Sequence, residues 1–195
     1  MLNEKLKDYN LILASASPRR HAFLKLMALD FEIRLKPVDE IYPPDLQKEE
    51  ITDFLAQLKA EPFQNELKPN DILITSDTIV WHKGEALGKP KDEQDAFDMI
   101  KRLSDDTHEV VTSICMSTTE RQIVKNTVTK VTFRPISDEA IKHYISMAQP
   151  LDKAGSYGIQ EWIGAIAILS VEGSYNNVVG LPTHLLYETL NSMVD

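Results

Sequence analysis

Two arginines, Arg19 and Arg20, stand at an unusual place, the start of a predicted helix. They follow Ser17 and Pro18, which begin helices because serine caps free amide groups and proline already has the backbone shape of the first helical position. The positive end of the helix dipole disfavours cations there by roughly 0.3–1 kcal/mol each. An anion over the turn, held by free amides and both guanidinium groups, would explain the pair. The alternative at this point is that both arginines pair with surface acids.

Acidic side chains follow predicted strands close to this turn. Glu40 comes shortly after an alternating strand pattern at 31–35, and Asp77 comes directly after an apolar run at 71–75. If strands 11–14 and 31–35 are parallel, their carboxyl ends share the sheet edge where ligands of such folds bind. Acids beside an anion site are explained by a divalent cation between them, since Mg²⁺ favours carboxylates, waters and phosphate oxygens. Taken singly, each acid is also explained as an ordinary loop or turn residue.

Two lysines are further candidates for phosphate contacts. Lys59 lies in the last turn of a helix predicted over 47–60, where the dipole favours a cation in any case. Lys89 is held between Gly88 and Pro90, a constrained stretch of backbone. For both, an ordinary surface lysine is the alternative reading.

The elements that must position these residues alternate between helix and strand. Strand 11–14, helix 18–28 and strand 31–35 predict a βαβ unit, and so an α/β fold. Further along, the pattern predicts two long strands at 108–117 and 121–133 and a helix from residue 137. A polar loop at 151–160, a strand at 165–171 and a last helix that ends near residue 193 follow. The polar loop contains two glycines, and long ordered loops often carry function.

Composition limits the class of protein. The 195 residues suffice for one domain, in one lobe or two, and the net charge of −9 argues against a general nucleic-acid surface. A single cysteine, Cys115, excludes an internal disulfide framework and is typical of a reducing compartment. The polar start at 1–10 and the lack of any apolar run near ~20 residues predict a cytoplasmic protein without a membrane span.

Several short stretches together resemble one family, the Maf nucleoside-triphosphate pyrophosphatases. They occur in the family's order and span nearly the whole chain, at 15–20, 38–40, 58–60, 76–78, 88–90, 152–160 and 177–182. The resemblance implies a single Maf-like domain over residues 1–195. It also implies an elongated mixed β-sheet flanked by helices, with two lobes around a central cleft, as in the inosine-triphosphate pyrophosphatases.

The resemblance implies hydrolysis of a nucleoside triphosphate between its α and β phosphates with the help of Mg²⁺ or Mn²⁺. Asp77 falls on the family's proton acceptor, and Lys59 and Lys89 fall on its basic catalytic positions. Glu40, together with Asp77, falls on the acidic positions expected to hold the metal. Whether Asp77 acts as general base or as metal ligand stays open.

The expected substrate-binding residues are Ser15, Arg19, Arg20, Thr78 and Gln160. Arginine, threonine and glutamine at 19, 78 and 160 resemble the dTTP/UTP branch, whereas the branch acting on 7-methyl-GTP typically has tryptophan, glutamine and glutamate there. An amide at 160 can donate and accept at once, as the paired edge of uracil or thymine requires. The chain departs from the family at residue 76, where serine replaces the common alanine.

The resemblance therefore predicts a housecleaning enzyme for dTTP, UTP and modified pyrimidine nucleotides, a hydrolase of phosphoric anhydrides. Two alternatives stay open. One is a pyrophosphatase for other non-standard nucleotides, and the other is a nucleotide-binding regulator of cell division and septum formation. The expected partner is the nucleotide, with no nucleic acid and no membrane, and a homodimer is compatible with the family.

Overall fold

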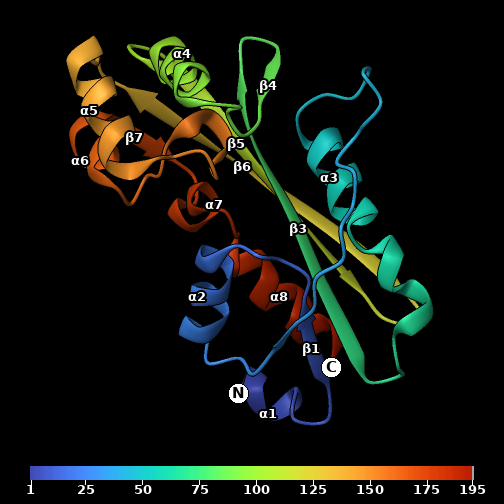
Figure 1. Cartoon of the computed structure of the whole chain (residues 1–195). Coiled ribbons are helices and arrows are strands. Elements are labelled where there is room, and N and C mark those ends of the chain that lie inside the picture. The colour runs from blue at the N-terminus through green and yellow to red at the C-terminus, as the bar shows by residue number, and fades with distance from the viewer. Residues whose placement is uncertain (195) are drawn as a thin grey trace. The chain divides into compact units, whose positions relative to one another are not determined.

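The structure, a computed structural model, describes residues 1–194 and contains a mixed seven-stranded sheet of order β2-β1-β3-β5-β6-β7, with β4 paired to β3 (Figure 1). The strands are β1 Asn10–Leu13, β2 Glu32–Ile33, β3 Asp71–His82, β4 Glu85–Leu87, β5 Thr107–Ser117, β6 Gln122–Phe133 and β7 Ile168–Glu172. The α-helices are α1 Leu2–Lys5, α2 Pro18–Leu26, α3 Glu49–Leu58, α4 Glu93–Leu103, α5 Asp138–Ala148, α6 Trp162–Ala167, α7 Tyr175–Val179 and α8 Thr183–Met193. Two 3₁₀ turns, η1 Glu61–Glu66 and η2 Ala154–Ser156, complete the elements. The predicted α/β class, with helices flanking a mixed sheet, is confirmed.

The chain folds into two compact units that alternate along the sequence. The first contains Met1–Asp77, Thr112–Thr127 and the residues from Gly180 onward, and the second contains Thr78–Val111 and Val128–Val179. Strands β3, β5 and β6 contribute residues to both units.

In the first unit, β1 is covered by helices on both faces. Leu11 and Leu13 pack in a core cluster with Leu24 of α2 and residues of α8, whereas Ile12 packs in a second cluster with Ala56 of α3 (Figure 1). A strand buried on both faces needs a continuous apolar run, which explains the sequence Leu-Ile-Leu. The strand is parallel to both β2 and β3, so the predicted βαβ unit is confirmed.

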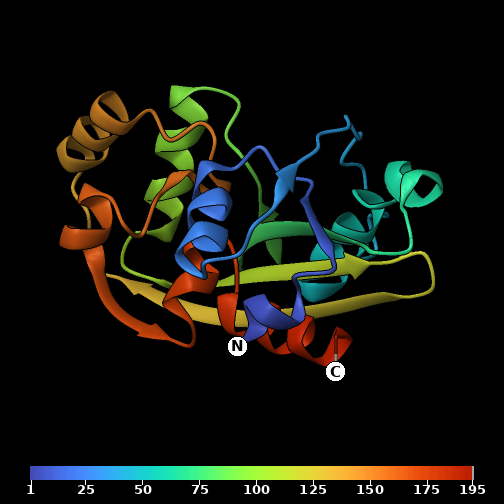
Figure 2. The ribbon, with the colours of Figure 1, turned by 90° about the horizontal axis from the view of Figure 1, so that it is seen from below.

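The two ends of the described chain also meet in the first unit. Both views place α1 beside α8 (Figures 1 and 2). Leu2 and Leu6 join the same core cluster as Leu190, and Lys5 Nζ donates to Asn191 Oδ1 at 3.0 Å. These contacts fix the last helix against the sheet.

In the second unit, α4, α5 and the loop that follows them pack over one core cluster. Its members include Ile100, Phe133, Tyr144 and Tyr157, each at most 6% exposed. Strand β7 pairs antiparallel with β6, and the register shifts between Thr132 and Phe133.

Three elements differ from the predictions. The strand predicted at 71–75 continues to His82, so Asp77 lies inside a 12-residue strand, and the prediction that it follows the strand is wrong. Strand β3 outlasts β1, with which it pairs up to Ile74, and then takes β4 as its partner from Val80. The predicted strand at 31–35 is only the short, exposed β2, and the strand predicted from 165 begins at Ile168 because the preceding residues form α6.

His108 is a buried titratable group inside this second core. Its Nε2 lies 2.7 Å from the Tyr157 hydroxyl, and its ring packs edge-on against Phe133. Burial and, to a smaller extent, the nearby His82 together lower the pKa of His108 to about 3, although Asp106 acts in the opposite direction. The folded chain therefore keeps this imidazole neutral at pH values where an unfolded chain binds a proton.

This difference predicts acid sensitivity. Between pH ~6.5 and ~3 the unfolded state binds the extra proton, so His108 lowers the free energy of unfolding as the pH falls, by at most ~1.4 kcal/mol per pH unit. His108→Gln keeps a hydrogen-bonding partner for Tyr157 but does not titrate. Urea unfolding from pH 7 to pH 4 should show a shallower pH dependence for this variant than for the wild type. His184→Gln, a change at an exposed histidine, is the matched control. Equal slopes for wild type and His108→Gln would contradict the assignment.

Candidate active site

The turn between β1 and α2 is organised by serine side chains. Ser17 caps α2 by accepting from the Arg20 backbone N–H at 3.5 Å, as its position in the sequence predicts. The hydroxyl of Ser15, which is 8% exposed, accepts from the Ser17 N–H at 3.2 Å. The predicted cap is confirmed, and it fixes the direction in which Arg19 and Arg20 leave the helix.

The Arg20 guanidinium makes contacts that the sequence did not reveal. Its Nε donates to the Gly180 carbonyl at 2.9 Å, and its Nη1 donates to the Ser76 carbonyl at 2.8 Å and to Ser15 Oγ at 3.4 Å. Burial lowers the pKa of Arg20, whereas the carboxylates of Asp77 and Glu40 act in the opposite direction. An arginine stays protonated in either case. Arg20 therefore joins the turn, the middle of β3 and the segment before α8, directly beside Asp77.

Lys59 connects the two predicted acidic residues. Its Nζ lies 2.6 Å from Asp77 Oδ1 and 3.1 Å from Glu40 Oε2. The side chain of Asp77 is 7% exposed, that of Lys59 18% and that of Glu40 47%. Lys59 follows α3 as its C-terminal cap, so the end of that helix sets the position of the ammonium group. The structure thus brings together Glu40, Lys59, Asp77 and Arg20, as predicted for a site handling phosphate.

One oxygen of Asp77 has no protein partner. Asp77 Oδ2 is buried and accepts no hydrogen bond, in contrast to Oδ1, and the adjacent Ser76 Oγ is also without a partner. A buried carboxylate oxygen without a partner is costly unless a ligand or water meets it. Within residues 1–194 no group of three or more His, Cys, Asp or Glu side chains could hold a metal ion by itself. Two carboxylates fit Mg²⁺ or Mn²⁺ nevertheless, because Mg²⁺ usually takes its other ligands from water and phosphate.

The remaining predicted residues belong to the second unit. Thr78 lies in β3, Lys89 is exposed between β4 and α4, and Gln160 is exposed at the end of the polar loop. The loops of Lys89 and Gln160 are joined, since the Gly155 N–H donates to the Gly88 carbonyl at 3.0 Å. Gly155 has φ +67°, and a Cβ there would lie 2.7 Å from Val80 Cγ2, so this close approach requires glycine.

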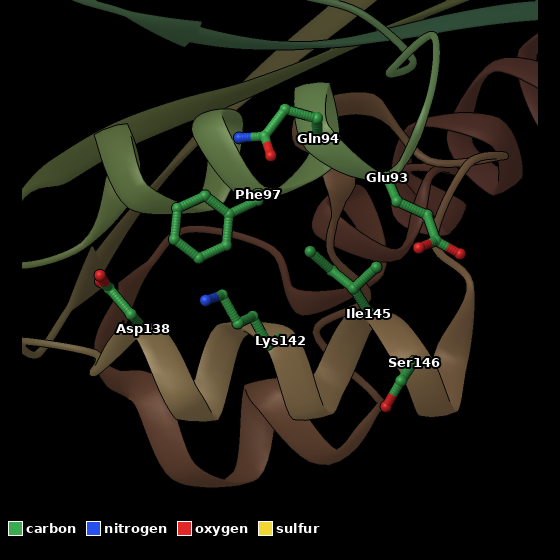
Figure 3. Close-up of a pocket in the computed structure, with 7 residues that line it drawn as sticks. All are labelled: Glu93, Gln94, Phe97, Asp138, Lys142, Ile145 and Ser146. Atoms are coloured by element: carbon green, nitrogen blue, oxygen red, sulfur yellow. The ribbon is translucent and has the colours of Figure 1, made fainter.

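The second unit contains a pocket of about 420 Å³ between α4 and α5. Figure 3 shows side chains of α4 facing those of α5 across it, with the Lys142 ammonium 5.8 Å from the centre of the Phe97 ring. Its lining residues are Glu93, Gln94, Phe97, Asp138, Lys142, Ile145 and Ser146. None of the predicted site residues is among them.

No helix among residues 1–194 is long and apolar enough to cross a membrane.

The contacts of Arg20 predict that replacing it lowers the stability of the fold even when the positive charge is kept. Arg20→Lys keeps the cation but cannot reach both carbonyl groups, and hydrogen bonds from charged donors contribute about 1.5–3 kcal/mol each. We expect the free energy of unfolding, measured in urea, to fall by about 3 kcal/mol. Arg34→Lys likewise keeps the cation but loses the paired hydrogen bonds of the guanidinium to the exposed Glu32 in the same unit, and it should cost less than about 1 kcal/mol. A loss no larger for Arg20→Lys than for this control would refute the anchoring role.

Comparison with known proteins shows which proteins this chain is similar to. A protein of Flavobacterium johnsoniae named dTTP/UTP pyrophosphatase is 60% identical over 194 residues and is covered completely, as is this chain. One with the same name from Flavobacterium psychrophilum is 56% identical over 96% of each chain. The solved structure of the Staphylococcus aureus Ham1 protein matches 94% of this chain and 99% of its own with a TM-score of 0.54 at 18% identity, a likeness of fold. The family model described as Maf-like protein matches residues 10–193, and the chain accordingly belongs to the Maf-like protein family.

Proposed function

We propose that this chain is a nucleoside triphosphate pyrophosphatase that hydrolyses dTTP and UTP to the monophosphate and pyrophosphate. The observation that carries the proposal is the buried Asp77 carboxylate, with one oxygen on Lys59 and the other without a protein partner. The names of the Flavobacterium relatives support the substrate, and their similarity extends over nearly the whole chain. Modified pyrimidine nucleotides are included in the proposal, as a housecleaning role requires.

In the proposed reaction a water attacks the α-phosphorus. The new bond joins the water oxygen to the α-phosphorus, the bond from that phosphorus to the α–β bridging oxygen breaks, and pyrophosphate leaves. Asp77 Oδ2, the oxygen without a partner, accepts the proton of the water. Lys59 holds Asp77 from its other side and offers positive charge to the phosphate oxygens. A phosphate contact of Lys89 stays a prediction from the family resemblance.

The divalent cation is part of the proposal. Mg²⁺ or Mn²⁺ held by Asp77 and Glu40 would supply neutralisation of the phosphate charge. Arg19 and Arg20 add positive charge at the start of α2, and the hydroxyl of Ser15 adds a polar group at the same turn.

Base selection is assigned to Gln160, Thr78 and Arg19. Gln160 is exposed, and its amide carries both a donor and an acceptor, which the paired edge of a pyrimidine such as uracil requires. The hydroxyl of Thr78 in β3 can likewise donate and accept.

The domain organisation is also part of the proposal. A single family domain is supported by the family match over residues 10–193 and by the alternation of the two units along the chain, with residue 195 outside the described part. A cytoplasmic location, a homodimer and the absence of a nucleic-acid partner stay predictions from the sequence.

Asp77→Asn tests the reaction. Asparagine has nearly the same shape but cannot accept the proton, and removing a general base typically costs about 10²–10⁴-fold. We expect pyrophosphate release from dTTP and UTP with Mg²⁺ to fall by that factor while the variant stays folded. Asp30→Asn, a change at an exposed acid of the same unit, should keep wild-type turnover. Near-normal turnover of Asp77→Asn would refute the catalytic role. A wild type that binds nucleotide without cleaving it would favour the regulator of cell division.

Gln160→Glu tests base selection. A carboxylate can only accept hydrogen bonds, so it suits the donors of guanine better than the edge of uracil. We expect the ratio of kcat/KM for UTP over 7-methyl-GTP to fall by at least about tenfold. Gln94→Glu, the same change at an exposed glutamine of α4, should leave the ratio unchanged. An unchanged ratio in Gln160→Glu would show that the Gln160 amide does not select the base.

A further inference from the structure

The loop that carries Gln160 contains a buried lysine. Lys153 is 8% exposed, and its Nζ lies 2.6 Å from Asp152 Oδ1 and 3.1 Å from Glu161 Oε1. Lysine is rarely buried unless its charge is paired, so this side chain is held by the two acids. Because Lys153 and Glu161 flank the loop, their ion pair joins its beginning to its end.

Tyr144 of α5 completes the contact. This tyrosine is fully buried, its hydroxyl donates to Glu161 Oε2, and it accepts from the Gly158 N–H at 3.0 Å. Burial and the neighbouring Glu161 raise the pKa of Tyr144 well above its usual value, so the hydroxyl keeps its proton. Both oxygens of Glu161 are therefore occupied, one by Lys153 and one by Tyr144.

Gly158 makes room for this carboxylate. A Cβ at Gly158 would lie 2.6 Å from Glu161 Cδ and 2.9 Å from each carboxylate oxygen. The head group of Glu161 thus occupies the space where a side chain at 158 would begin. Tyr144, Lys153 and Glu161, called the loop clamp below, close the loop upon itself and bind it to α5.

Stability alone is a poor explanation for the loop clamp. The Lys153 side chain is 10% exposed and that of Glu161 26%, so both charges lose part of their hydration, and replacing such a pair by neutral groups of similar volume is often neutral or stabilising. The same pair constrains geometry strongly, since both partners must keep their positions. Gln160 lies between the buried Ile159 and the clamped Glu161, while its own side chain is exposed.

We propose that the loop clamp positions Gln160 for base selection. Lys153, Glu161 and Tyr144 are positioning residues, which act through the backbone on both sides of Gln160. The inference rests on the proposed function, because it assigns a cause to the pyrimidine preference of that site. Displacing a contacting group by about 1 Å can cost about a hundredfold in rate, so a loosened loop should lower selectivity measurably.

The test combines the near-isosteric variants Lys153→Met and Glu161→Gln, singly and together, in the full chain. For UTP with Mg²⁺ we expect KM to rise at least about tenfold and kcat to change less than about threefold. The ratio of kcat/KM for UTP over GTP should fall at least about tenfold in each variant. The double variant should be no worse than the worse single one, because both changes break one interaction. Hydrogen exchange at amides 154–160 should accelerate in the same variants without nucleotide.

The matched control is Lys101→Met with Asp138→Asn, which removes an exposed ion pair of 2.6 Å between α4 and α5. It should change neither the ratio nor the loop exchange. Tyr144→Phe keeps the ring and removes one donor to Glu161, so it serves if a charge variant fails to fold, and it should lower the ratio in the same direction.

The outcomes separate the two proposals. A wild type with pyrimidine preference and variants that keep the ratio would overturn the loop clamp and leave the proposed function intact. Equal losses for UTP and GTP, together with a lower melting temperature, would show a structural role alone and also overturn it. A wild type without pyrimidine preference would overturn both proposals.

Discussion

The hydrogen bonds of the partly buried Arg20 guanidinium are the interaction on which the first unit most depends. It donates to carbonyl groups of Gly180 and Ser76, residues far from it in sequence, and so holds the strand that carries Asp77. The helix dipole disfavours a cation at this position by at most about 1 kcal/mol. Charge-assisted hydrogen bonds contribute about 1.5–3 kcal/mol each, so the contacts outweigh the dipole. The unusual arginine is thus explained by contacts within the protein, and an anion over the turn is not needed to explain it.

Local signals explain which parts of the fold could be predicted from the sequence. Ser17 and Pro18 define the start of α2, and the apolar run at Leu11–Leu13 defines β1, because capping and burial act over a few residues. The continuity of β3 through residues 76–78 could not be predicted, since polar residues usually end a strand. Asp77 remains inside it because Lys59, from another element, pairs with its carboxylate. The spacing of hydrophobic residues along the sequence does not reveal such a contact between two elements.

In the candidate site, too, some features could be predicted from the sequence and others could not. The sequence predicts Glu40, Lys59 and Asp77 as residues of one site, and the structure brings them into contact. That Lys59 lies between both acids could not be predicted, because the sequence offers 30 acidic side chains as partners. The contacts of Glu161 were missed for the same reason: Tyr144 reaches it from another helix, and glutamate beside a loop carries no signal of its own.

The contacts of Lys59 bear on the proposed binding of a phosphate group. An ammonium group has three donors, and two of them are directed at Asp77 and Glu40. A phosphate oxygen can take the third donor without releasing either acid, so binding of substrate and retention of both carboxylates are compatible. If Lys59 turned wholly toward the phosphate, Asp77 Oδ1 would lose its partner inside the protein, which is unfavourable for a buried carboxylate. The lysine therefore keeps Asp77 Oδ1 paired, while Oδ2 has no partner within the protein.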